Sequence, residues 1–220
     1  MEFSIARQNM VESQIRPNGI TDLALISALG DVERENFADD ARRSVAYLDE
    51  DLPIGSQGTN RFLLEPMVLG RLLQMAEIKP CDLVLDIGPG SGYSSAVIAR
   101  LAESVVGVEE DTELCELSGQ KLLDMGVTNA VIICGEHASG TANEAPFDVI
   151  VINGRVPEVP AALIDQLADG GRLVAVIGGK NQARATVIKK QGQKLSTKAV
   201  FDAAAPLLSG FDVAPTGFQF

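Results

Sequence analysis

Between residues 83 and 178 the chain alternates runs of Val, Ile and Leu with amphipathic segments, and this alternation restricts the possible folds more than any other feature. The apolar runs predict strands at 83–88, 104–110, 130–136, 147–154 and 172–178, and the segments between them predict helices at 93–102, 111–126 and 160–169. Strands that are apolar along their whole length are typical of a sheet covered on both faces. Alternating strands and helices give parallel strands joined by right-handed crossovers. The sequence therefore predicts an α/β fold with a doubly wound, mostly parallel sheet.

The flanking segments add helices before this core and an antiparallel pair after it. Apolar residues recur at helical spacing within residues 1–30, where Thr21-Asp22 is a helix start, and another predicted helix runs from Pro66 to residue 77. The polar stretch 47–62 contains proline and glycine and predicts a loop. The runs ATVIKKQG and STKAVFD predict an antiparallel edge at the C-terminus. Because no repeat or linker divides the chain, we expect a single domain over residues 1–220.

Composition excludes several kinds of chemistry. The chain has one histidine, His137, so a site with several histidine ligands is impossible, and we expect no metal. The three cysteines, Cys81, Cys115 and Cys134, are far apart in sequence and form no CxxC pair, which argues against a zinc site or a disulfide framework, and their odd number suits a reducing compartment. No apolar run is long enough to span a membrane and no signal-peptide pattern opens the sequence, so we expect a cytoplasmic protein without membrane contact.

The net charge of −12 is unevenly distributed. Residues 1–169 carry 11 Lys and Arg against 28 Asp and Glu, whereas residues 170–201 carry 7 basic residues and no acidic one. An acidic surface repels phosphate backbones, so we expect no nucleic-acid partner. We interpret the basic stretch at 172–198 as the solvated face of strands and turns.

A glycine-rich segment, DIGPGSG, joins the first predicted strand to its helix. Its D-x-G-x-G-x-G pattern differs from a phosphate-binding P-loop and from GxGxxG, in which the third glycine comes one residue later. Glycines allow the backbone to turn sharply and a ligand to approach it closely, and parallel sheets bind ligands at the carboxyl ends of their strands. We predict that this segment lines a cofactor site; the alternative is a tight turn with no ligand. The residues concerned are Asp86, Gly88, Pro89, Gly90, Ser91 and Gly92.

Acidic residues at the ends of the next two strands indicate which cofactor binds. Glu109 lies 17 residues after Gly92, where a carboxylate can accept both hydroxyls of a ribose. Glu136 and His137 follow the third strand, at the level where an adenine ring would lie; for His137, a polar residue that merely lines the loop is the alternative. Carboxylates repel a pyrophosphate but not a cationic sulfonium. The pattern therefore favours S-adenosylmethionine over NAD.

With these motifs, the chain resembles the protein-L-isoaspartate O-methyltransferase family over roughly residues 9–180. The resemblance implies a Rossmann-like class I methyltransferase fold, with residues 1–65 as a helical and loop extension on the substrate side. It implies methylation of the α-carboxylate of isoaspartyl residues in damaged proteins or peptides, and we expect a monomer or a homodimer. The segments that carry it are MVESQIRPNGITD, VERENF, AYLDEDLPIG, VLDIGPGSGYSSAVIARLA, APFDVIVING and VPAALIDQLADGGRLVAVIG.

One segment departs from the family pattern. Members usually carry G-x-T-x-S-x-P after the PIG motif, with hydroxyls beside the acceptor carboxylate. With Pro66 aligned to the family proline, Leu64 stands in place of the serine. The polar residues nearby are Thr59, Asn60 and Arg61, which we take as the acceptor-side candidates, because a guanidinium binds a carboxylate through two hydrogen bonds. The alternative is a solvated loop with Arg61 in a surface ion pair.

Three functional hypotheses follow from this departure. The first is an isoaspartyl carboxyl methyltransferase, the second a class I methyltransferase with a different acceptor, and the third a catalytically silent homologue that binds the cofactor. A carboxylate acceptor is ionised at pH 7 and needs no general base, so a chain with one histidine is compatible with the first. After the fourth strand, Asn153 either lines the active site or forms an Asn-Gly turn.

Overall fold

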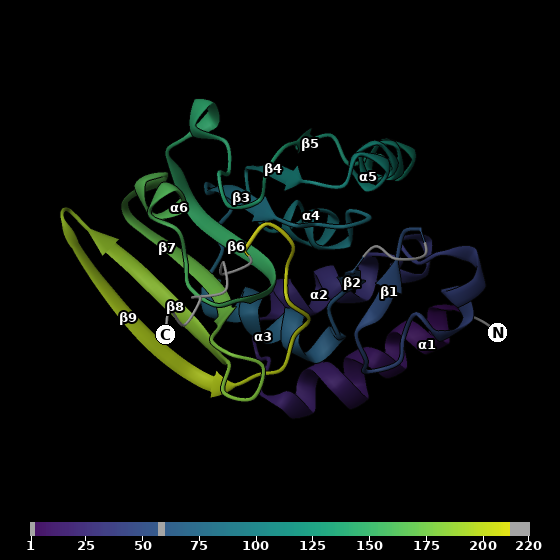
Figure 1. The fold of residues 1–220 in the computed structure, drawn as a ribbon. Coiled ribbons are helices and arrows are strands. Elements are labelled where there is room, and N and C mark those ends of the chain that lie inside the picture. The colour runs from purple at the N-terminus through teal and green to yellow at the C-terminus, as the bar shows by residue number, and fades with distance from the viewer. Residues whose placement is uncertain (1–2, 57–59, 212–220) are drawn as a thin grey trace, which may run out of the picture.

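The computed structural model describes residues 3–56 and 60–211, and a seven-stranded sheet forms its centre (Figure 1). The strand order is β5-β4-β3-β6-β7-β8-β9. Strands β3 to β7 run parallel, and β8 and β9 pair antiparallel at one edge. The predicted fold class is therefore confirmed. The strands are β3 (Leu83–Ile87), β4 (Ser104–Glu109), β5 (Ala130–Cys134), β6 (Phe147–Val156), β7 (Leu167–Ile177), β8 (Arg184–Gln191) and β9 (Lys194–Asp202).

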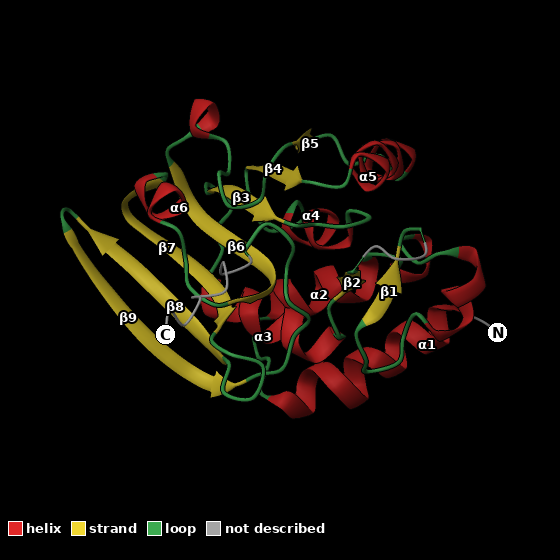
Figure 2. Ribbon diagram, in the orientation of Figure 1, coloured by secondary structure: helices red, strands yellow, loops and turns green. Residues whose placement is uncertain are grey.

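Side chains alternate between the two faces of the sheet and build a hydrophobic core on each side. In β3, Val84 belongs to one core and its neighbour Leu85 to the other. The first face is covered by the helices α1 to α5, and the second by α6 and by the segment after β9; Figure 2 shows α1, α2 and α3 grouped away from α6. The helices are α1 (Phe3–Met10), α2 (Leu23–Asp31), α3 (Pro66–Ala76), α4 (Tyr93–Ile98), α5 (Thr112–Asp124) and α6 (Ala161–Asp165).

The helix starts follow local capping chemistry. Asp22 accepts hydrogen bonds from the amides of Ala24 and Leu25 at 2.9 and 3.2 Å, which confirms the predicted start of α2. Pro66 occupies the first turn of α3, where a missing amide proton costs nothing. Shorter helical turns connect these elements: a π-helical turn at Val11–Ile15 and 3-10 turns at Arg16–Asn18, Arg34–Asn36, Asp40–Val45 and Ala142–Glu144.

Two predicted elements differ most in the structure, and the predicted helix 93–102 also ends early, at Ile98. The predicted loop 47–62 contains β1 (Leu52–Ile54), which pairs antiparallel with β2 (Arg61–Leu63). Leu52 and Ile54 are buried and Pro53 is exposed, so a strand pattern exists but is only three residues long. The predicted helix 160–169 stops at Asp165, because Leu167 already pairs with Phe147 in the sheet and the chain has become β7.

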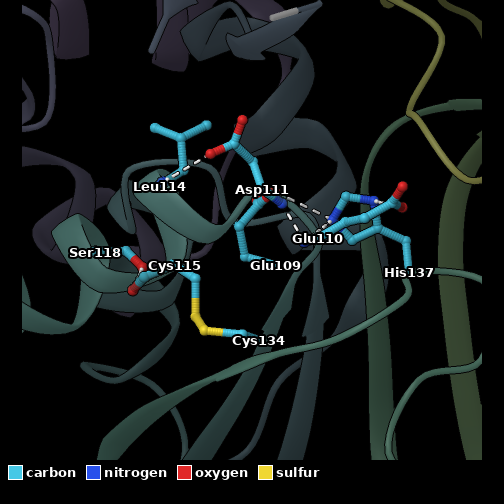
Figure 3. The surroundings of a disulfide bond; sticks show 8 residues. All are labelled: Glu109, Glu110, Asp111, Leu114, Cys115, Ser118, Cys134 and His137. Atoms are coloured by element: carbon cyan, nitrogen blue, oxygen red, sulfur yellow. Dashed lines mark hydrogen bonds and ion pairs between the residues drawn. A yellow bond between two sulfur atoms is a disulfide. The ribbon is translucent and has the colours of Figure 1, made fainter. Parts of the chain in front are cut away.

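A disulfide joins Cys115 of α5 to Cys134 at the end of β5, and the expectation that no disulfide forms is wrong (Figure 3). The two residues are 19 positions apart, yet their Cα atoms lie 5.6 Å from each other. Helix α5 packs directly against β5, which follows it in the chain. This packing brings the two cysteines together although they are far apart in the sequence. Cys81 is free and exposed.

Across residues 3–56 and 60–211, no helix combines the length and the apolar character that crossing a bilayer requires. The same residues contain no cluster of His, Cys, Asp and Glu that could hold a metal ion.

Candidate cofactor site

The strand order reverses between β3 and β6, and parallel sheets bind ligands at such a switch point. The glycine loop (residues 88–92) connects β3 to α4 there. Gly88 and Gly90 have φ values of 71° and 60°, in the left-handed region that favours glycine. A Cβ added to Gly88 would lie 2.8 Å from Leu208, and one added to Gly90 would lie 2.5 Å from Ile54. Both positions therefore need glycine for backbone conformation and for space.

Asp86 anchors the start of the glycine loop from inside the protein. Its carboxylate is fully buried and accepts hydrogen bonds from the hydroxyls of Ser94 and Ser95 at 2.7 and 2.6 Å. The side-chain amide of Asn153 donates to the same carboxylate, so Asn153 links β6 to the end of β3. Burial raises the pKa of Asp86 to about 6, because these hydrogen bonds only partly offset it.

Glu109 ends β4 beside the glycine loop, and its carboxylate is completely buried. Arg61 binds it at two points, with Nε 3.2 Å from Oε1 and Nη2 2.5 Å from Oε2. The amide of Gly90 donates to Oε2 at 2.8 Å. The amides of Glu110 and Asp111 each donate to Oε1 at 3.1 Å. The residue predicted to bind a ribose thus lies where predicted, with its oxygens engaged by the chain itself.

His137 completes the surroundings of Glu109, and Figure 3 shows its ring turned toward the end of β4. The ring is buried, with Nε2 3.3 Å from Oε1 of Glu109 and Nδ1 3.1 Å from the carbonyl oxygen of Ser209. Burial alone would raise the pKa of Glu109, but the hydrogen bond with His137 and the charge of Arg61 outweigh it and lower that pKa to about 2. Glu136 is exposed and accepts a hydrogen bond from a neighbouring serine, so its carboxylate stays outside this cluster.

Two segments that are distant in sequence cover the glycine loop. One is the β1–β2 hairpin, which contributes Ile54 and Arg61. The other is the closing segment (residues 206–211), which Figure 1 shows running in yellow from β9 toward the carboxyl end of β3. The closing segment is held to β6, because the amide of Leu208 donates to the carbonyl of Arg155 at 2.9 Å and the amide of Arg155 donates to that of Pro206 at 2.8 Å. All five residues of the glycine loop are buried as a result.

The acceptor-side candidates Thr59, Asn60 and Arg61 differ in their exposure and in their contacts. Thr59 lies outside the described residues. Asn60 is exposed, and its amide donates to the carbonyl of Leu207 at 3.4 Å. Arg61 is only 4% exposed, so its ion pair with Glu109 is a buried one. Leu64, which replaces the family serine, is buried and offers no hydroxyl.

Sequence reasoning missed two groups of residues at this site. Leu208 and Ser209 of the closing segment contact Gly88 and His137, and the apolar run AAAPLL after the last strand was their only signal. Arg34 was also missed. It is fully buried and donates to the carbonyl of Leu64 at 2.9 Å, which fixes the end of the hairpin, and nothing in its local sequence marks that role.

The residues around the glycine loop fit an adenosine cofactor in their chemistry. A buried carboxylate ends β4, a glycine loop with left-handed glycines precedes α4, and a histidine follows β5. The space is restricted: the two cavities beside Phe62 and Asn153 measure about 10 Å³ each, and the one lined by Asn60, Arg61, Glu110, Asp111 and Ser209 measures about 210 Å³. Each is smaller than the roughly 300 Å³ at which pockets for small ligands begin. The hairpin and the closing segment must therefore move apart for such a ligand to enter.

Fold and site together define a Rossmann-like class I methyltransferase domain. The family model for protein-L-isoaspartate (D-aspartate) O-methyltransferase matches residues 6–205. A protein-L-isoaspartate O-methyltransferase from Koribacter versatilis is 35% identical over 214 residues, covering 97% of this chain and 95% of the relative. One from Methanoculleus marisnigri is 38% identical over 188 residues, covering 85% of this chain and 84% of the relative. The chain belongs to the protein-L-isoaspartate O-methyltransferase family.

Solved structures agree with this assignment. A protein-L-isoaspartate O-methyltransferase superposes with a TM-score of 0.83 at 25% identity, covering 93% of this chain and 67% of that chain. A protein from Plasmodium falciparum, described as a β-aspartate methyltransferase in complex with S-adenosyl-L-homocysteine, has a TM-score of 0.77 at 20% identity and covers 93% of this chain and 98% of that one. The second likeness supports the fold.

Proposed function

We propose that this chain is an S-adenosylmethionine-dependent methyltransferase that acts on the free carboxylate of L-isoaspartyl residues in damaged proteins and peptides. The observation that carries the proposal is the buried carboxylate of Glu109, set against left-handed glycines at the switch point of a chain of this family. The partner is then a protein or peptide with an isoaspartyl residue, and we propose the cytoplasm as its location.

The proposal gives each cofactor-side residue a task. The bound cofactor supplies a methyl group that is already activated on a sulfonium. Glu109 would accept the ribose hydroxyls, and the backbone of Gly88 and Gly90 would let the ligand lie close to the loop. Asp86 and Asn153 would hold the loop in position through their mutual hydrogen bond. The remaining cofactor-side candidates are Pro89, Ser91 and Gly92 in the loop and Glu136 and His137 after β5.

The acceptor side needs alignment more than acid–base chemistry. An isoaspartyl carboxylate has a reference pKa of roughly 4, so it is ionised at neutral pH and attacks without a general base. In-line displacement then depends on holding the two reacting atoms in a fixed orientation. Thr59, Asn60 and Arg61 are the proposed acceptor-side residues, with the guanidinium of Arg61 as the donor for the carboxylate.

A second candidate function is methyl transfer to a different acceptor. The observation that favours it is the replacement of the acceptor-side hydroxyl by the buried, apolar Leu64. Under this alternative the cofactor side is unchanged, and only the group that approaches the hairpin differs.

Mass spectrometry of model peptides tests the proposal. An isoaspartyl peptide incubated with the protein and S-adenosylmethionine should gain one methyl group on the isoaspartyl carboxyl. Glu109→Ala should weaken cofactor binding about 10- to 150-fold, because a pair of charge-assisted hydrogen bonds is lost. Arg100→Gln is the matched control, since Arg100 is exposed and precedes β4 at the opposite edge of the sheet. Unchanged affinity in Glu109→Ala would remove Glu109 from the site.

A further inference from the structure

The carboxylate of Glu109 has no acceptor position left for another donor. A carboxylate offers about four lone-pair positions, whereas donors from four residues make five hydrogen bonds to its two oxygens, at 2.5 to 3.2 Å. The four are Arg61, Gly90, Glu110 and Asp111, and Nε2 of His137 lies 3.3 Å from Oε1 and 3.1 Å from the amide of Glu110. Ribose hydroxyls can therefore reach Glu109 only if some of these groups leave it.

Arg61 is the group best placed to leave. The three other donors are backbone amides, which the glycine loop and the turn into α5 hold in place. His137 is fully buried and held on its other side by the carbonyl of Ser209. Arg61 has a long side chain and belongs to β2, a three-residue strand whose only strand partner in the described part of the chain is β1. Rotation of one side chain, or movement of this small hairpin, releases it.

The guanidinium of Arg61 also lies between Glu109 and the glycine loop. Its Nη2 atom would lie 3.2 Å from a Cβ added to Gly88, while the same atom is 2.5 Å from Glu109. A nucleoside that contacts both the glycine loop and the carboxylate of Glu109 must occupy the space that the guanidinium fills. Arg61 therefore obstructs the ligand both by volume and by satisfying the carboxylate that would bind it.

The closing segment reinforces this arrangement from the other side. Leu208 packs on Gly88, and the carbonyl of its neighbour Leu207 accepts the 3.4 Å hydrogen bond from Asn60, which directly precedes β2 of the hairpin. The hairpin and the closing segment thus lie over the same glycine loop, and the hydrogen bond between Asn60 and Leu207 joins them. Movement of the hairpin away from the closing segment breaks this hydrogen bond and leaves the bonds between the closing segment and β6 in place.

We propose that Arg61 acts as a latch on the cofactor site: its guanidinium holds Glu109 in the free protein and is displaced when the ribose of the cofactor binds. This inference rests on the proposed function, because it takes the ribose to bind at Glu109. Arg61 is then a positioning residue that sets cofactor affinity, since every binding event must first break a buried ion pair. Loss of the guanidinium should strengthen cofactor binding, the opposite of what a direct ligand contact predicts.

Calorimetric titration with S-adenosylhomocysteine tests the latch. We expect Arg61→Gln to bind at least tenfold more tightly than the wild-type protein, and Arg100→Gln to bind as the wild type does. Arg61→Lys keeps the charge but cannot make both hydrogen bonds, so its affinity should fall between the two. If Arg61→Gln does not fold, as judged by circular dichroism, Arg61→Lys answers the question alone.

The outcomes separate the latch from the proposed function. Equal or weaker binding by the folded Arg61 variants, with measurable binding by the wild type, overturns the latch and leaves the proposed function standing. Binding only by the Arg61 variants supports the latch in its strongest form. No binding by any folded variant overturns the proposed function and the latch with it.

Discussion

Replacement of Arg61 or Glu109 alone should destabilise the protein strongly, and replacement of both should restore most of the loss. The two side chains are 4% and 0% exposed and make two hydrogen bonds with each other. Removing one partner of a buried ion pair leaves the other charge uncompensated and costs about 3–5 kcal/mol, whereas replacing both is often nearly neutral. Arg61→Met and Glu109→Gln should each cost this much, so a double-mutant cycle should give a coupling of about 3 kcal/mol or more.

Urea denaturation of the wild type, the two single variants and the double variant measures this coupling. The free energies of unfolding are compared only between proteins with the same slope of free energy against urea concentration, so that changes in the unfolded state do not affect the comparison. Arg100→Gln is the surface control and should stay within about 0.5 kcal/mol of the wild type. Additive single effects, within about 0.5 kcal/mol, would refute the reasoning that these two residues form a buried pair.

Acid stability, the disulfide and peptide binding can each be tested separately. The pKa of Glu109 is lowered from an ordinary 4.5 to about 2, so its ionised carboxylate stabilises the folded state, fully above pH 4.5. The free energy of unfolding should therefore fall as the pH drops toward 2, and it should fall less in Glu109→Gln. The same dependence of unfolding free energy on pH in both proteins would contradict this. Reduction of the Cys115–Cys134 disulfide, whose cysteines are 19 positions apart, should lower the free energy of unfolding by about 3 kcal/mol. The stability of Cys115→Ser should not change with reductant. An unchanged urea midpoint of the wild type after reduction would contradict this prediction. An isoaspartyl peptide should bind more tightly with S-adenosylhomocysteine present, because the displaced Arg61 is then available to its carboxylate; calorimetry showing equal affinities would count against that role.

The central sheet could be predicted because its strands are buried on both faces. Every position in runs such as LVLDI must then be compatible with a core, which leaves a continuous apolar signal. The β1–β2 hairpin could not be predicted, because three alternating residues around Pro53 give too short a pattern and the neighbouring glycines indicate a turn. The early end of α6 was also hidden, since pairing of Leu167 with Phe147 is a tertiary effect.

The candidate site could be predicted in part for a similar reason. The carboxyl ends of adjacent parallel strands meet at one edge, so Glu109 had to lie near the glycine loop once the topology was known. The partner of that carboxylate could not be predicted. Arg61 is 48 positions away in the sequence, and no periodicity relates a short hairpin to the end of β4. The disulfide was missed on the same ground, because sequence spacing does not measure distance across a helical crossover.

The most direct test of the proposed activity is the initial rate of methyl transfer from radiolabelled S-adenosylmethionine to an isoaspartyl peptide, compared with the matching aspartyl peptide. We expect transfer to the isoaspartyl peptide alone, and its loss in Glu109→Ala. Calorimetric binding of S-adenosylhomocysteine by the same preparation shows that the protein is competent. Cofactor binding without transfer to the isoaspartyl peptide would contradict the proposed substrate and leave a methyltransferase fold with a different acceptor.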